Sequence, residues 1–372
     1  MNNLRHLDPY LLRSLVNDII MVAQRGWDPD DLMHVLGPAS AAVLEKAAPQ
    51  VPANVDIPAT RSAWLKFRPS IYDLNLASTI SERTAASWLD KMYRLPWLRD
   101  VEVIADSKNS EPVFDNPKQK KMHEKITALL AKAESTQFED EADALIAKAQ
   151  NLRQQYRIDS VLENFEDSAE DIIALRVRIK GPWVKHQHTL LGSVACPNGG
   201  AAVLLSDFGI CTVMATRDDA EHIVDLYNSL NRQRAWFMKN SDGAKLAAQD
   251  GETSSYRRSF ILAYASKIHQ LLHEANTEAA KAQQEAVKQS SASGERAVNE
   301  RTYEIVSRAL PVLARRQAAS EEALDDLFPN LSSMNLSANH TRGIIDGVDA
   351  AEKSHLGGDK SGIRTGRNEL AS

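Results

Sequence analysis

Basic side chains between residues 176 and 239 give the sequence its strongest candidate for a binding chemistry. Arg176, Arg178 and Lys180 alternate with apolar residues, a pattern typical of a strand with one buried and one solvated face. The solvated face is then cationic, and a few such charges can support salt-sensitive binding of phosphate groups. The simpler interpretation of the strand alone is an ordinary solvated face. Lys185 lies nearby in the sequence, and four more cations accompany Trp236 around the predicted last helix of the same module, which completes the candidate nucleic-acid site: Arg217, Arg232, Arg234 and Lys239.

Histidines are the second group that could do chemistry, because neutral imidazole is a common metal ligand. His186 and His188 stand two residues apart. His269 and His273 occupy positions i and i+4 of a predicted helix, where they could share a metal ion. The motif is incomplete, since Glu274 follows the second histidine of this pair and no HExxH is present. We expect ordinary core or surface histidines, and a metal-dependent hydrolase stays as a second alternative.

The sequence contains no other catalytic signature. It has neither GxSxG nor a Cys/His nucleophile motif, and its C-terminal glycines, including Gly343 and Gly347, are not spaced as in a P-loop or a dinucleotide fingerprint. We therefore expect a protein that is not an enzyme and carries no cofactor. The preferred function is association with nucleic acid, and the first alternative is a protein–protein interaction scaffold that uses helical grooves.

Residues 116–160 form the most strongly patterned segment, and they predict two helices. After an Asn-Pro pair typical of a helix start, apolar residues recur with a helical period from 122 to 133. Thr136 with Glu139 forms a capping box before a second such period from 142 to 156. Because the connection is only a few residues long, we expect the two helices to pack side by side as a hairpin.

The two predicted helices also carry a resemblance. The strings ITALLAKAEST and EADALIAKAQNLRQQYRID, joined by an acidic turn (126–159), are similar to the helical hairpin of a bacterial and phage family, domain of unknown function 2786 (DUF2786). Weaker similarity downstream, in WVKHQHTLLGSVA, RRSFILAYASKI and GIIDGVDAAEKSHLGG, resembles the companion regions of its actinobacterial members. The resemblance implies an intact architecture over most of the chain, and it brings no catalytic residues with it.

The rest of the chain predicts an α+β protein that is mainly α. Asp-Pro pairs at Asp8 and Asp28 start helices in an N-terminal helical module. From residue 172 the apolar period changes to two, which predicts a small β-α-β-β-α module with flanking helices. A further short strand is expected at 309–314. The expected modules are a helical N-terminal module at 1–110, the helical hairpin at 116–160, the α+β module at 172–330 and a loosely ordered tail rich in Gly, Ser and Asn at 331–372.

The composition and charge of the sequence limit the cellular compartment and the kinds of partner that we expect. The 372 residues carry a net charge of −6, which argues against a general nucleic-acid coat but is compatible with a local basic face. The first residues lack the uninterrupted apolar core of a signal peptide, and no apolar run has the length of a membrane span. The two cysteines, Cys196 and Cys211, fit a reducing compartment. We expect a cytoplasmic protein that binds no membrane.

Overall fold

A computed structural model describes residue 4, residues 6–52, 58–98, 172–291 and 309–354, and isolated positions between 121 and 152. The hairpin predicted at 116–160 therefore falls almost wholly outside the described residues, and it stays a prediction. For the described part, the fold class is α+β and mainly α, as the sequence predicts.

The chain divides into two compact units, which are described separately. The first unit comprises Met1–Glu111, Arg176–Lys180 and Leu205–Thr212. The second unit comprises Pro112–Leu175, Gly181–Leu204 and Val213–Ser372. Two short segments that the sequence places in the α+β module thus belong to the first unit together with the N-terminal helices.

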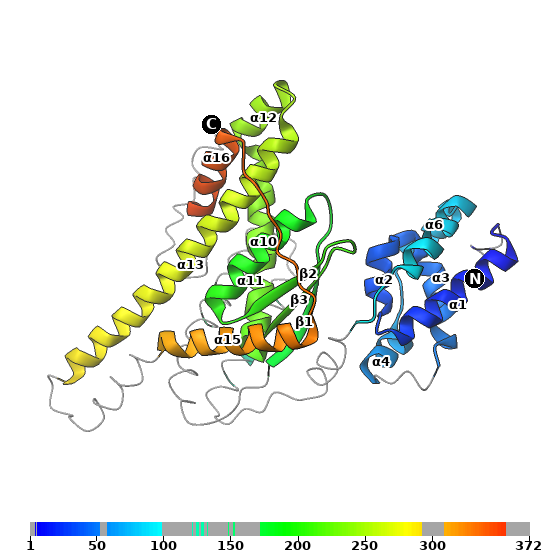
Figure 1. Cartoon of the computed structure of the whole chain (residues 1–372), viewed down its shortest axis with the longest axis horizontal. Coiled ribbons are helices and arrows are strands. Elements are labelled where there is room, and N and C mark those ends of the chain that lie inside the picture. Colours follow the sequence, from blue (N-terminus) through cyan, green and yellow to red (C-terminus); the bar gives the residue numbers. More distant parts are fainter. Residues whose placement is uncertain are drawn as a thin grey trace. The chain divides into compact units, whose positions relative to one another are not determined.

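The first unit is built from short helices, drawn from blue to cyan in Figure 1. Two of them begin at the predicted Asp-Pro pairs. The Asp8 carboxylate accepts a hydrogen bond from the Leu11 amide at 3.1 Å, and the Asp28 carboxylate accepts one from the Asp31 amide at 2.7 Å. Both N-cap predictions are therefore confirmed. The helices are α1 (Pro9–Gln24), α2 (Pro29–Leu36), η1 (Pro38–Ser40), α3 (Ala41–Ala47), η2 (Ala48–Gln50), α4 (Pro58–Lys66), α5 (Ile71–Asn75), η3 (Leu76–Thr79) and α6 (Glu82–Tyr93).

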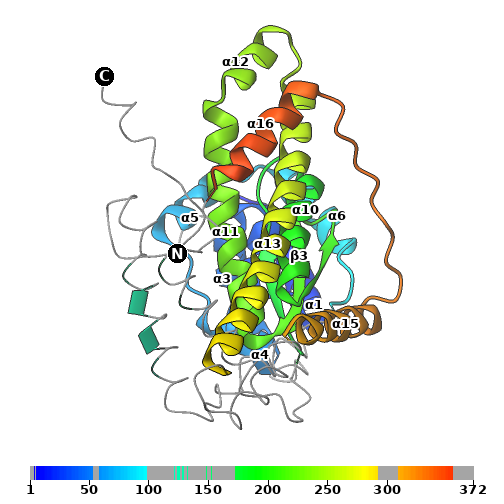
Figure 2. The ribbon, with the colours of Figure 1, turned by 90° about the vertical axis from the view of Figure 1, so that its left-hand side faces the viewer.

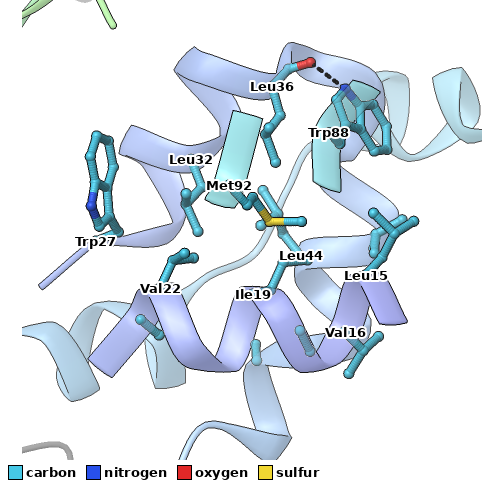
Figure 3. Packing of buried hydrophobic residues seen from close by; sticks show 14 of the residues in the cluster. Leu15, Val16, Ile19, Val22, Trp27, Leu32, Leu36, Leu44, Trp88 and Met92 are labelled. Atoms are coloured by element: carbon cyan, nitrogen blue, oxygen red, sulfur yellow. Dashed lines mark hydrogen bonds between the residues drawn. The ribbon is translucent and has the colours of Figure 1, made fainter. Parts of the chain in front are cut away.

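Buried tryptophans organise the core of the first unit. Trp88 donates its indole N–H to the carbonyl of Leu36 at 2.9 Å, and Figure 3 shows this bond among the apolar side chains that surround it. Trp64 donates to the carbonyl of Trp27 at 3.1 Å, and Trp27 donates to the carbonyl of Pro96 at 2.8 Å. Each indole therefore buries a large apolar area while its polar N–H stays satisfied.

The predicted β-α-β-β-α order is confirmed. The elements are β1 (Ile172–Arg178), α10 (Val184–Ala195), η4 (Cys196–Asn198), β2 (Ala201–Leu205), β3 (Ile210–Thr216) and α11 (Arg217–Asn240). The three strands form an antiparallel sheet in the order β1-β3-β2, whose strands contribute residues to both units. Among the described residues, the second unit continues with the helices α12 (Asp242–Gln249), α13 (Thr253–Ser291), α15 (Ala309–Leu327) and α16 (Thr341–Glu352).

The helices α10, α11 and α13 pack against one another beside the strands (Figures 1 and 2). Two tyrosines of α13 fix its alignment with α11. The Tyr264 hydroxyl donates to the carbonyl of Leu230 at 3.2 Å, and the Tyr256 hydroxyl lies 2.6 Å from the hydroxyl of Ser241. Because the later residue of α13 meets the earlier residue of the α11 region, the two helices run antiparallel.

The C-terminal region differs from its prediction in two places. Residues 309–314 begin the helix α15 and are not a strand, and part of the expected loose tail is a helix, α16 (Thr341–Glu352). α16 packs closely on α13, as Figure 2 shows. A Cβ atom on Gly343 would lie 2.5 Å from the carbonyl oxygen of Tyr256, and one on Gly347 would lie 2.5 Å from that of Phe260. The glycines that indicate a loose tail by composition therefore permit this close approach.

Trp183 has an unusual backbone conformation at the start of α10. Its φ angle is 60° and its ψ angle is 41°, in the left-handed helical region. Among the described residues it is the one non-glycine residue with a positive φ angle. For a bulky side chain this conformation costs on the order of 1–2 kcal/mol. The surrounding structure therefore holds Trp183 in a backbone conformation that a residue of its type disfavours.

Candidate nucleic-acid interface

The strand cations Arg176 and Arg178 are neutralised within the first unit. A terminal nitrogen of Arg176 lies 2.6 Å from Asp31 Oδ2, and the Nε of Arg178 lies 2.6 Å from Asp31 Oδ1. Arg178 also contacts Asp28 at 3.2 Å. The Arg176 side chain is only 7% exposed. The expectation of a solvated cationic face on this strand is therefore wrong at these two positions, because two carboxylates of α2 and its N-cap cover them.

The electrostatics of this cluster follow from its burial. Burial is the largest influence and raises the pKa of Asp31, with Asp28 acting in the same direction, while Arg176 and Arg178 oppose them. For Arg178, burial favours a lower pKa, but the carboxylates of Asp31 and Asp28 outweigh it and raise the pKa. A charge group of this kind holds parts of the unit together and is not available to an external phosphate.

The other predicted cations fall into separate environments. Arg234 is buried, and its guanidinium donates to the side-chain oxygen of Asn231 at 2.8 Å and 3.0 Å. Burial lowers the pKa of Arg234, with Tyr227 and Tyr264 opposing. Arg217 is half-buried at the start of α11, whereas Lys180 and Lys185 are exposed. The eight predicted cations therefore do not form one continuous surface of equivalent charges.

Two of the predicted cations remain together with an aromatic residue on α11. Arg232, Trp236 and Lys239 are spaced by four and three residues, so they lie on one face of the helix. Arg232 and Lys239 are exposed, and Trp236 is 55% exposed. Phe237 packs edge-on against the Trp236 ring, with centroids 5.1 Å apart at 82°. We call these three residues the Trp236 face.

The Trp236 face has no acidic counterpart in the part of the chain that the structure describes. No ion pair joins Arg232 or Lys239 to a described carboxylate. The sequence from 226 to 241 contains no Asp or Glu, and Asp242 at the start of α12 pairs with Lys245 at 2.8 Å. An exposed indole between two unpaired cations can stack on a planar ring while the cations contact negative groups.

The histidines are not assembled as a metal site in the described residues. No three His, Cys, Asp or Glu side chains within those residues come together as ligands. His186 and His188 lie on α10 and are half-buried, whereas on α13 His269 is half-buried and His273 is exposed. Burial lowers the pKa of His186, and Arg258 adds to this effect. The geometry gives no observation in favour of the metal-dependent hydrolase alternative.

We expect acidification to destabilise the second unit through His188. Burial lowers the pKa of His188 below its ordinary value of 6.5, although a hydrogen bond to the backbone of Ala202 opposes the shift. The unfolded chain therefore binds the proton more readily, so stability is present above pH 6.5 and is lost as the pH falls towards the folded pKa. Urea unfolding at pH 7.5 and 5.5 measures this, and a His188→Gln variant should show a weaker pH dependence. An equal pH dependence in the two proteins would contradict the assignment.

The described residues define an α+β protein, mainly α, with a cationic helix face, and none of their helices has the length and apolar character that crossing a bilayer requires. Residues 121–160 match the family model described as "Protein of unknown function (DUF2786)". The match confirms the resemblance to the DUF2786 family for this segment of the chain. No curated protein and no solved structure matches the chain.

Proposed function

We propose that this protein binds nucleic acid through the Trp236 face. The observation that carries the proposal is the exposed indole of Trp236 between Arg232 and Lys239, two exposed cations that no described carboxylate neutralises. Base–aromatic stacking contributes about 1–3 kcal/mol per base, and it does not require a particular sequence. Phosphate contacts by the two cations release counterions, so the affinity falls as salt rises. The proposal assigns the protein a binding function and no reaction.

Loss of the Trp236 face is expected to weaken nucleic-acid binding by at least tenfold. The variant Trp236→Ala removes stacking, and Arg232→Gln with Lys239→Gln removes two phosphate contacts. For a single strand, the second change should also reduce the slope of log K against log salt by about 1.4, since each contact contributes about 0.7. Fluorescence anisotropy of labelled DNA and RNA across a salt series measures both quantities.

A matched control variant distinguishes the loss of contacts at the Trp236 face from a general loss of positive charge. Arg315 and Lys353 are exposed cations of the second unit, outside the Trp236 face. The variant Arg315→Gln with Lys353→Gln removes the same charge and should bind nearly as wild type does. If both charge variants lose affinity equally, or if wild type binds no nucleic acid at about 50 mM salt, where phosphate contacts are strong, the proposal is wrong.

A protein-interaction scaffold is the second candidate, and exposed apolar side chains of the first unit support it. Five of them, on or next to its helices, are 70–84% exposed: Tyr10, Ile71, Tyr72, Tyr93 and Trp97. Large exposed apolar residues are enriched at sites of protein association when they gather in one patch. Capture of partners from a cell lysate, compared between wild type and a Tyr93→Ser/Trp97→Ser variant, tests this candidate. A partner that binds both proteins equally would not use these residues.

A further inference from the structure

A second cationic and aromatic cluster lies where α10 meets α13 in the second unit. The Arg257 guanidinium carbon lies 5.8 Å from the centroid of the Trp183 ring, over its face. Arg258 lies close enough to His186 to lower the pKa of that histidine, after burial, which is the larger cause. Lys185, which precedes His186 in the first turn of α10, is exposed. We call Trp183, Lys185, Arg257 and Arg258 the Trp183 patch.

The cations of the Trp183 patch are not neutralised by the described residues. No described carboxylate forms an ion pair with Lys185, Arg257 or Arg258. The acid nearest in sequence on the α13 side is Glu252, and it contacts His340 at 3.1 Å. This differs from Arg176 and Arg178, which are equally basic by sequence but are covered by carboxylates. Three positive charges from two helices therefore stay available to an external anion.

The two arginines are also partly ordered before any ligand arrives. The cation–π contact with the Trp183 ring restricts the guanidinium of Arg257. Arg258 donates its Nε–H to the carbonyl of Ser254 at 3.2 Å, and this bond leaves the two terminal amino groups to bind a second partner. A guanidinium held in this way loses less side-chain freedom when it binds a phosphate.

We propose that the Trp183 patch is a second contact site for single-stranded nucleic acid, in which Lys185, Arg257 and Arg258 bind phosphate groups. This inference rests on the proposed function, and it adds the strandedness of the ligand. In a duplex the base faces are stacked on each other, whereas a single strand can place unstacked bases against exposed aromatic rings. Trp236 offers such a ring, and the Trp183 patch supplies charges on other helices of the same unit.

The experiment compares two sets of full-length variants with one pair of probes. Labelled oligothymidylate of 20 nucleotides and a 20-base-pair duplex are titrated by fluorescence anisotropy at several salt concentrations. We expect the single strand to bind at least tenfold more tightly than the duplex. Arg257→Gln with Arg258→Gln should weaken single-strand binding about tenfold or more and reduce the salt slope by about 1.4. The control is again Arg315→Gln with Lys353→Gln.

Two further variants test how the patch works. Arg257→Lys keeps the charge but not the planar stacking group, so an intermediate affinity is expected. Trp183→Gly suits the left-handed backbone but lacks the indole, so it should weaken binding while the urea midpoint of the protein is maintained. A Trp183→Gly protein that binds as wild type does would remove the indole from the site.

The outcomes distinguish this inference from the proposed function. If the Trp183 patch variant binds as wild type does while Trp236→Ala loses affinity, the inference is overturned and the Trp236 face stands. If the patch variant loses affinity and Trp236→Ala does not, the patch stands and the Trp236 face is overturned. Equal binding of the duplex overturns the preference for single strands. Absence of any binding to either probe overturns both proposals.

Discussion

Replacing Asp31 with asparagine should lower the free energy of unfolding of the first unit by about 3–5 kcal/mol. Asp31 is fully buried, and each of its carboxylate oxygens accepts a hydrogen bond from a different arginine at 2.6 Å. Asparagine has nearly the same shape but no charge, and its amide would point a donor at one guanidinium. Both guanidiniums would then lose the buried negative charge that they share, which is the costly change for such a cluster.

The neighbouring residue provides a control for the Asp31 prediction. Asp30 is exposed and lies in the same first turn of α2, so Asp30→Asn should change the stability by no more than about 0.5 kcal/mol. Urea unfolding followed by tryptophan fluorescence measures both variants, since the core of the first unit contains Trp27, Trp64 and Trp88. Equal small effects for the two variants would show that the buried cluster does not stabilise the unit.

Adding methyl groups to the two buried glycines of α16 should release this helix from α13. The Cβ atoms of Gly343→Ala and Gly347→Ala would each lie 2.5 Å from a backbone carbonyl oxygen of α13. Backbone atoms cannot rotate away as a flexible side chain can, so α16 must shift. Overpacking of this kind costs about 1–3 kcal/mol for each site. Hydrogen exchange of the α16 amides measures the loss, and we expect exchange in the double variant to be faster by tenfold or more.

A third glycine, where an added methyl group is expected to stabilise the protein, provides the control. Gly192 lies within α10, and a Cβ atom there would meet no other atom within 4 Å. Gly192→Ala should therefore stabilise the second unit by about 0.5–1 kcal/mol, because alanine loses less backbone freedom in a helix. If the double variant at 343 and 347 exchanged as slowly as Gly192→Ala, the close approach of α16 would not depend on these glycines.

Sequence analysis predicts those features of the fold that depend only on residues close together in the chain. The helix starts at Asp8 and Asp28 depend on bonds within three residues of the cap. The order β-α-β-β-α follows from the change in apolar period near residue 172. Both signals act over a few residues, so they do not depend on which distant segment packs against them. The C-terminal helix α16 was not predicted, because its glycines indicate a loose tail by composition, whereas in the structure they permit close packing on α13.

The candidate interface was only partly predictable, because charge patterns do not reveal their partners. Arg176 and Arg178 have the alternation of a solvated strand, yet their carboxylates lie 145 to 150 residues away in sequence. Arg232, Trp236 and Lys239 lie on one helix, and their i to i+4 and i+3 spacing places them on a common face. Arg257 and Arg258 were missed, because only the packing of α10 on α13 brings Arg257 to Trp183 and Arg258 towards His186.

The composition of the first unit has a consequence for how the protein is made. Its core includes Ile210, with Phe208 packed edge-on against Trp27 at 5.6 Å, and its buried Asp31 depends on Arg176 and Arg178. A ribosome releases the N-terminal helices long before it adds these residues. The first unit can therefore reach its final packing only after synthesis has passed residue 212, and until then the early helices carry an uncompensated acid and an open apolar surface.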